Sequence, residues 1–174
     1  MKTVIFAAAA AASLALAAPA FAQADNFSGF RAEALAGYDA VKTNSNGLGT
    51  PDGLLYGLGL GYDLRAGGAV VGLEGEIADS TASRGAIDAA RDIYVGARVG
   101  LPLGPQMLAY AKAGYANGRV NTPAFRQNGD GFRLGGGLEY ALGGNLFVKA
   151  EYRYTNYEQD VERHQLVGGL GVRF

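Results

Sequence analysis

Charged side chains recur at alternate positions of segments that are otherwise apolar. Seven of these side chains are basic and six are acidic, so their charges nearly cancel. A lone charge in a narrow, water-poor interior is costly, whereas a nearly balanced set can pair and hydrogen-bond. We therefore expect one interior lined by an ion-pair network of these residues: Arg31, Glu33, Asp63, Glu74, Glu76, Arg98, Lys112, Arg133, Glu139, Lys149, Glu151, Arg153 and Arg173.

The remaining residues that could carry chemistry do not predict catalysis or cofactor binding. His164 is the only histidine and cysteine is absent, so a zinc-type metal site is not predicted. The glycine strings at 57–61 and 135–137 lack the G-x-G-x-x-G spacing of a nucleotide site. Residues 128–130, Asn-Gly-Asp, lack the full spacing of a calcium loop and indicate a turn. We expect neither an enzyme nor a cofactor.

The charged residues lie on segments in which apolar residues alternate with small or polar ones. A period of two is typical of a β-strand, whose successive side chains point to opposite faces. Ten such residues, tilted in a membrane, cover about 23 Å, close to the apolar band that a transmembrane barrel presents to lipid. Eight segments fit the pattern: residues 30–40, 54–64, 69–78, 92–101, 107–116, 132–142, 146–154 and 166–174.

The final segment shows the pattern most clearly. Leu166, Leu170 and Phe174 fall on its apolar face, and Gly169 and Arg173 fall on the other face. An apolar face toward lipid and a small or charged face toward a lumen are typical of a transmembrane β-barrel. The pattern predicts that Leu170→Asp blocks membrane insertion and that Gly169→Ala has a mild effect.

Tyrosines stand near the ends of these segments on the apolar face. Tyrosine prefers the membrane–water interface, so this placement predicts an aromatic girdle. The tyrosines concerned are Tyr38, Tyr56, Tyr62, Tyr115 and Tyr154.

The connections between segments alternate between short and long. Short turns on one side and long loops on the other are typical of outer-membrane barrels. An even number of strands also lets the sheet close without an unpaired edge in lipid. We predict an eight-stranded antiparallel transmembrane β-barrel with both termini in the periplasm. The short periplasmic turns are expected at 65–68, 102–106 and 143–145, and the long extracellular loops at 41–53, 79–91, 117–131 and 155–165.

Residues 1–22 have the features of a secretory signal peptide. Lys2 precedes an apolar run rich in alanine and leucine, and the run ends in Ala20-Phe21-Ala22, an A-x-A cleavage site. We expect cleavage after Ala22 and a single barrel domain over 23–174. The formal net charge of −1 provides no basic surface for nucleic acid.

Four runs of residues carry a family resemblance. They read YAKAGY at 110–115, GGGLEY at 135–140, VKAEYRY at 148–154 and VGGLGVRF at 167–174. In these runs the chain resembles the opacity-type family of outer-membrane barrels, which is similar in fold to OmpX and to the transmembrane part of OmpA. The resemblance implies a Gram-negative outer membrane, with lipids and lipopolysaccharide around the barrel. Phe174 resembles the terminal aromatic residue that the barrel-assembly machinery reads.

We expect a structural and surface-interactive role, in which the barrel supports envelope integrity and the external loops support adhesion to a surface ligand. Tyr157, in the last predicted loop, is a candidate for stacking on carbohydrate. A narrow pore would need a water path past the charges. A lipid-modifying enzyme would need a serine, such as Ser80 or Ser83, close to His164. A soluble lipocalin-type carrier would need apolar residues inside, the reverse of the pattern here.

Overall fold

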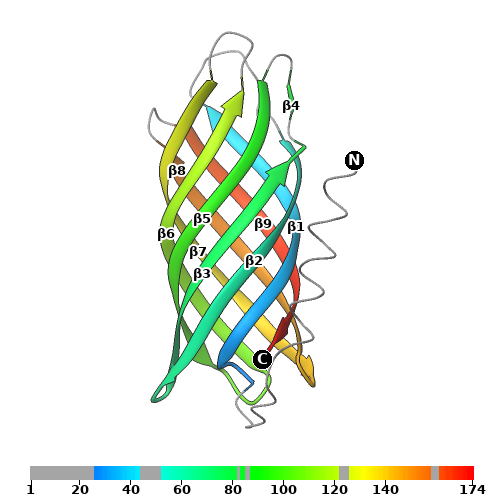
Figure 1. Ribbon diagram of the computed structural model, residues 1–174, viewed down its shortest axis with the longest axis vertical. Helices are drawn as coiled ribbons and strands as arrows, with labels where there is room; N and C mark the ends of the chain where they lie inside the picture. The colour runs from blue at the N-terminus through cyan, green and yellow to red at the C-terminus, as the bar shows by residue number, and fades with distance from the viewer. Residues whose placement is uncertain (1–25, 44–51, 82, 85–86, 122–125, 158–160) are drawn as a thin grey trace.

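The computed structural model describes residues 26–43, 52–81, 83–84, 87–121, 126–157 and 161–174, which form strands and the turns between them (Figure 1). The predicted signal peptide lies outside the described residues and stays a prediction. The strands are β1 (Gly29–Thr43), β2 (Asp52–Ala66), β3 (Ala69–Ser80), β4 (Ser83–Arg84), β5 (Ile87–Pro102), β6 (Met107–Asn121), β7 (Arg126–Gly143), β8 (Leu146–Tyr157) and β9 (Val161–Arg173).

In the described part of the chain, no helix is long and apolar enough to cross a membrane.

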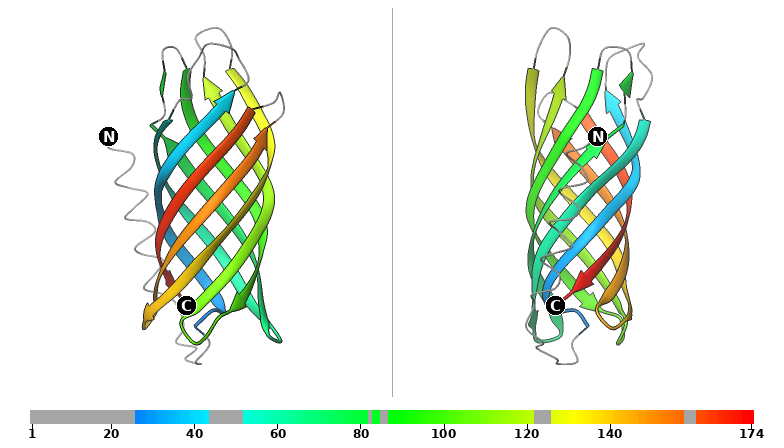
Figure 2. Two further views of the ribbon diagram at one scale, coloured as in Figure 1. Left: turned by 180° about the vertical axis from the view of Figure 1, so that it is seen from behind. Right: turned by 45° about the vertical axis from the view of Figure 1, so that its right-hand side comes forward.

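Eight long strands form one closed antiparallel barrel. Each long strand pairs with the next, β3 pairs with β5, and β9 pairs back with β1; the two-residue β4 pairs with β5. Figure 2 shows β1 and β9 side by side along the closing seam, which runs from Arg31 opposite Arg173 to Thr43 opposite Val161. Closure gives the backbone groups of both edge strands a partner, which lipid cannot provide. The predicted eight-stranded antiparallel barrel is confirmed.

Glycines make room for the long side chains that point into the lumen. Arg31 lies opposite Gly61, and Lys112 lies opposite Gly135. A Cβ added at Gly61 would stand 2.8 Å from the guanidinium carbon of Arg31, and one at Gly135 would stand 3.0 Å from Cγ of Lys112. Each stem therefore lies flat across the backbone of the neighbouring strand, where a side chain would displace it.

The strands are longer at their outer ends than the sequence pattern predicts. β6 and β7 stay paired for six residue pairs beyond Tyr115 and Phe132, up to Asn121 opposite Arg126. Parts of all four predicted loops are therefore strand. The sequence pattern does not detect these strand ends, because outside the apolar band both faces of a strand carry polar residues and the alternation of apolar and polar residues is lost.

Three tight turns close the opposite end of the barrel, at the positions that the sequence predicts. They contain Gly67, Gly104, Gly143 and Gly144, all with positive φ, a conformation that glycine adopts without a steric penalty.

A short segment before β1 packs at this same end of the barrel. Phe27 is buried there against Val70 and Leu108, and Asn26 Nδ2 donates to the carbonyl oxygen of Pro105 at 2.8 Å. This end of the barrel, the predicted periplasmic end, therefore carries a small buried apolar cluster.

Candidate functional site: the charged lumen

All thirteen charged residues predicted to face an interior lie inside the barrel. Each is at most 7% exposed, and Arg31 and Arg153 are fully buried. They sit on alternate positions of the long strands, so the strand period directs every one of them inward. Within the lumen the charges can be described as three groups, stacked from the periplasmic end to the outer end. Two ion pairs link the first group to the second: Arg31 with Glu33 at 3.0 Å and Lys112 with Glu74 at 2.8 Å.

The periplasmic group contains three arginines and three carboxylates. Asp63 is its centre: it accepts from Arg31 Nε at 3.1 Å and from Arg98 Nη2 at 2.6 Å. Arg98 and Arg173 also bind the two oxygens of Glu139, at 3.0 and 2.6 Å. The group consists of Arg31, Arg98, Arg173, Asp63, Glu74 and Glu139.

The middle group has two lysines, one arginine and three glutamates. Lys112 Nζ lies 2.8 Å from carboxylate oxygens of Glu76 and of Glu151. Lys149 Nζ donates to Glu33 Oε1 at 2.7 Å. Tyr110 adds a neutral donor, because its hydroxyl donates to Glu151 at 2.6 Å. The charged members are Lys112, Lys149, Arg153, Glu33, Glu76 and Glu151.

The outer group contains three charged residues that the sequence prediction left out: Asp39, Asp92 and Arg163. Arg163 binds Asp39 through Nε at 2.8 Å and Asp92 through Nη1 at 3.0 Å. Arg133 binds the same Asp92 and donates from Nε to Thr155 at 2.9 Å. The described residues thus place eight basic and eight acidic side chains in the lumen, so the buried charge is balanced.

The three omitted residues carry a sequence signal that was available. Asp39 has the strand parity of Arg31, and Asp92 has the parity of Tyr94 and Arg98. Arg163 lies ten residues before Arg173, and therefore also on its face, but it falls inside a predicted loop. Asp39 and Asp92 already lie within the predicted segments 30–40 and 92–101, so counting the strand parity to the end of each segment finds them. Extending the last segment outward with its parity unchanged finds Arg163.

A tyrosine ring separates the outer group from the middle group. Tyr94 lies 4.6 Å from Lys112 Nζ and 5.2 Å from the guanidinium carbon of Arg133, measured to the ring centroid. Its side chain covers Gly96 and Gly114, where an added Cβ would collide with it. The ring thereby attracts two cations that would otherwise repel each other.

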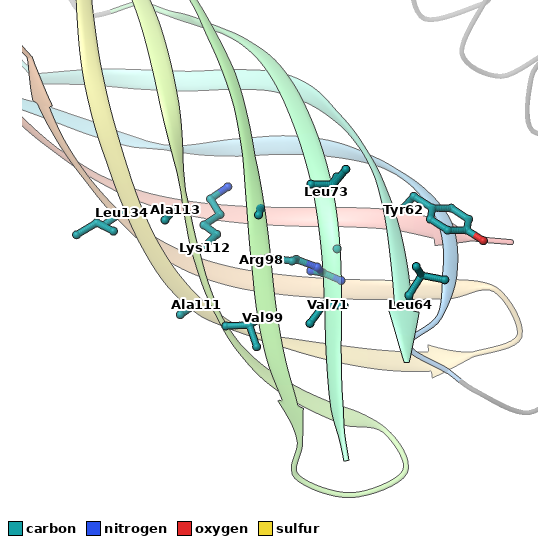
Figure 3. A pocket seen from close by; sticks show the side chains of 12 residues that line it. Tyr62, Leu64, Val71, Leu73, Arg98, Val99, Ala111, Lys112, Ala113 and Leu134 are labelled. Atoms are coloured by element: carbon teal, nitrogen blue, oxygen red, sulfur yellow. The ribbon is translucent and has the colours of Figure 1, made fainter. Parts of the chain in front are cut away.

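The outer wall of the barrel has a hollow whose lining is largely apolar. The hollow, about 610 Å³, has Ala111 and Ala113 in its lining, together with bulkier side chains such as Leu73 and Leu134 (Figure 3). Lys112 also lines it, although its ammonium group is paired inside the lumen. The hollow is therefore a lipid-facing depression rather than a catalytic pocket.

His164 and Ser80, the pair that an enzyme of this shape would need, are engaged with other residues. His164 Nδ1 lies 2.6 Å from the hydroxyl oxygen of Tyr152 on the outer wall. Ser80 Oγ donates at 3.0 Å to Asp39, whose carboxylate is fully buried in the lumen. Ser83 has no described side chain. Among the described residues, no cluster of three or more histidine, aspartate or glutamate side chains is arranged to hold a metal ion.

The interpretation of Tyr157 as an exposed loop residue is wrong. Tyr157 ends β8 and is only 9% exposed. A Cβ added at Gly118 or Gly131 would lie within 3.1 Å of its ring or hydroxyl, so the side chain lies across β6 and β7 inside the barrel. Its parity with Arg153 and Thr155 explains the inward direction.

The chain is similar to several known outer-membrane proteins. Residues 8–174 match the family described as outer membrane protein beta-barrel domain. The 25 kDa outer-membrane immunogenic protein of Brucella ovis is 30% identical over 146 residues, which cover 79% of this chain and 72% of that protein. Its Brucella abortus counterpart is 31% identical over 70% of this chain and 60% of its own length.

Solved structures share the fold at lower identity. Neisserial surface protein A (NspA) has a TM-score of 0.63 at 21% identity, covering 84% of this chain and 98% of NspA. Ail of Yersinia pestis has a TM-score of 0.57 at 20% identity, and the match covers 84% of this chain and 99% of Ail. The outer membrane enzyme PagL also shares the fold, with a TM-score of 0.51 at 13% identity. The match covers 83% of this chain and 99% of PagL. Fold alone therefore does not separate enzymes from other barrels, but the family match is decisive: the chain belongs to the outer membrane protein beta-barrel family and is a small β-barrel of the Gram-negative outer membrane.

Proposed function

We propose that this protein is a closed, non-conducting barrel whose role is structural and surface-interactive. The barrel supports the envelope, and its outer strand ends and connections contact partners outside the cell. The observation that carries the proposal is the pairing of eight basic with eight acidic side chains in the lumen. A barrel of eight strands has an interior just wide enough for side chains to fill.

The charged groups are suited to closing the lumen rather than to guiding ions. Each group contains equal numbers of cations and anions, and each cation contacts at least one carboxylate. A mobile ion would have to break several such contacts in succession, each in a water-poor interior where separated charges are costly. A small buried apolar cluster of Phe27, Val70 and Leu108 lies at the predicted periplasmic end. These features favour a plug over the narrow pore.

The outer end offers a stiff platform for surface contacts. The pairing of β6 with β7 continues beyond Tyr115 as far as Asn121 opposite Arg126. Loops on a rigid scaffold are where binding functions are usually found. Ail, an attachment invasion locus protein, has been crystallised with the heparin analogue sucrose octasulfate; this supports a surface ligand as the class of partner for a barrel of this shape.

The proposed role is non-catalytic. A lipid-modifying enzyme would need a nucleophile at His164, and the hydroxyl held there belongs to Tyr152 rather than to a serine.

A complementation experiment in the parent bacterium tests the proposal. A strain lacking this chain receives the wild-type protein, or a variant with residues 44–51 and 122–125 replaced by short Gly-Ser linkers. We expect both proteins to restore resistance of the envelope to detergent, and only the wild type to restore attachment of cells to host-type surfaces. Equal attachment with the linker variant, or an unchanged envelope in the deletion strain, would contradict the proposal.

A further inference from the structure

Three rings gather on the outer wall where β8 and β9 approach their outer ends. Tyr152 and Tyr154 project outward from β8 and His164 projects outward from β9, alternating with inward residues of the lumen. The His164 ring centroid is 6.1 Å from that of Tyr152 and 5.2 Å from that of Tyr154. An aromatic girdle alone does not account for the position of His164, the single histidine of the chain, between two tyrosines.

Hydrogen bonds hold these rings in one arrangement. Tyr152 and His164 share the 2.6 Å contact between hydroxyl and Nδ1. The Tyr154 hydroxyl donates to Glu162 Oε1 at 3.0 Å, and the other oxygen of Glu162 lies 3.9 Å from His164 Nε2. Half of the Glu162 side chain and about a quarter of the His164 side chain stay accessible. The cluster therefore presents aromatic surface beside a carboxylate and an imidazole.

The position of this cluster along the barrel determines which part of the membrane surrounds it. Along β9 the outward positions run from Leu170 and Leu166 to His164 and Glu162, that is, from apolar to polar. The tight periplasmic turns lie at the other end of the barrel. The cluster thus stands where the apolar band ends on the extracellular side, at the level of the head groups in the outer leaflet.

We propose that Tyr152, Tyr154, Glu162 and His164 form a contact site for a sugar ring in the head group of the glycolipid that surrounds the barrel. The C–H face of a sugar packs on an aromatic ring, while its hydroxyls donate to a carboxylate and exchange hydrogen bonds with imidazole. Glu162 disfavours a phosphate or sulfate at the same place, because like charges repel. The site is directed at neutral sugar and not at the anionic groups of the glycolipid.

The composition of the chain makes the test direct. Because His164 is the only histidine, the imidazole signals of an untagged, refolded barrel report this site alone by NMR. The probes are a purified, phosphate-free core oligosaccharide of lipopolysaccharide, sucrose octasulfate as a sulfated sugar, and phosphatidylglycerol as a lipid without sugar. The variants are Tyr154→Leu and Glu162→Gln. The matched control is Tyr140→Leu, another exposed and hydrogen-bonded tyrosine, which lies at the periplasmic end.

We expect the core oligosaccharide to shift the imidazole signals of the wild type and of Tyr140→Leu in a saturable way, and the shift to be lost in both cluster variants. Heat-modifiable migration on gels shows that each variant is folded. An absent shift, an equal shift in Tyr154→Leu, or a shift produced only by phosphatidylglycerol would overturn the proposal and leave a plain interfacial girdle. A stronger response to sucrose octasulfate would overturn it in favour of an anionic ligand.

Discussion

Arg163 and Asp92 meet inside the barrel from opposite walls, with Nη1 of the arginine 3.0 Å from Oδ2 of the aspartate. In the circular order of strands, three long strands separate β9 from β5 in either direction. Arg163 also binds Asp39 on the neighbouring β1. One side chain therefore braces the outer end of the barrel across its full width.

Replacing Arg163 tests this brace. In Arg163→Met, Asp92 keeps Arg133, but Asp39 loses the guanidinium that pairs with it and keeps the neutral Ser80 hydroxyl as a donor. An uncompensated buried carboxylate is expected to reduce the free energy of unfolding by about 3–5 kcal/mol. Urea titration of the refolded barrel, followed by gel mobility, measures the loss. Arg91→Met is the control, because Arg91 is exposed and should change stability by no more than about 0.5 kcal/mol. Equal effects of the two substitutions would contradict the brace.

Two adjacent glycines on β9 test which face of this strand points into the lumen. A Cβ at Gly169 would lie 2.9 Å from Cγ of Lys149 and 3.2 Å from a methyl group of Leu35, whereas a Cβ at Gly168 would approach nothing closer than 3.7 Å. We expect Gly169→Ala to destabilise the barrel by about 1–3 kcal/mol through overpacking, and Gly168→Ala to stay within about 0.5 kcal/mol. The same urea titration decides; a larger effect at Gly168 would mean that the two faces are reversed. The mild effect that the sequence pattern predicts for Gly169→Ala is thereby revised.

The cost of an arginine on the lipid-facing wall shows how deep in the bilayer the substituted position lies. Leu170 is 54% exposed and lies on the lipid-facing side of β9, four residues after Leu166. Leu170→Arg is expected to cost about 2–4 kcal/mol in a bilayer, whereas Leu54→Arg, at the outer end of β2, should cost about 0–1 kcal/mol. Folding yields and unfolding titrations in phospholipid vesicles give both values. A larger penalty at Leu54 would place the bilayer elsewhere on the barrel.

Phe174 can act through packing or as a signal for assembly, and a pair of variants separates the two. Its ring lies 6.3 Å from that of Phe30, and the two residues exchange backbone hydrogen bonds of 3.1 and 2.8 Å across the seam. We expect Phe174→Ala and Phe30→Ala to lose similar stability after refolding in detergent, because both remove the same contact. In cells, we expect Phe174→Ala alone to lower the amount of assembled barrel several-fold. Equal losses in cells would leave Phe174 with a packing role.

The sequence pattern predicted the barrel because the constraints that the bilayer imposes can be recognised in short stretches of sequence. Lipid-facing residues, lumen-facing residues and turns follow from the strand period and from glycine placement. The inward direction of Lys149 and Glu151, for example, needed only a count of two from Arg153.

Partners within the lumen could not be predicted in the same way. Which carboxylate meets Arg163 depends on strand tilt and on the offset between strands around the closed sheet, and no local pattern records these. Asp92 lies 71 positions from Arg163 in the sequence. The extent of the strands was missed for a related reason. Outside the apolar band, inward residues such as Tyr157 and Arg163 have polar neighbours, so the alternation that marks a strand disappears.

The claim that the paired charges close the lumen is tested most directly by the conductance of the refolded barrel in a planar bilayer. Protease protection in vesicles of the same lipid confirms that the barrel is inserted. We expect a silent membrane for the wild type over a wide range of voltage. Stable conductance steps from the wild type, altered in size or ion selectivity by Arg133→Met, would contradict the account and show that the lumen is a pore.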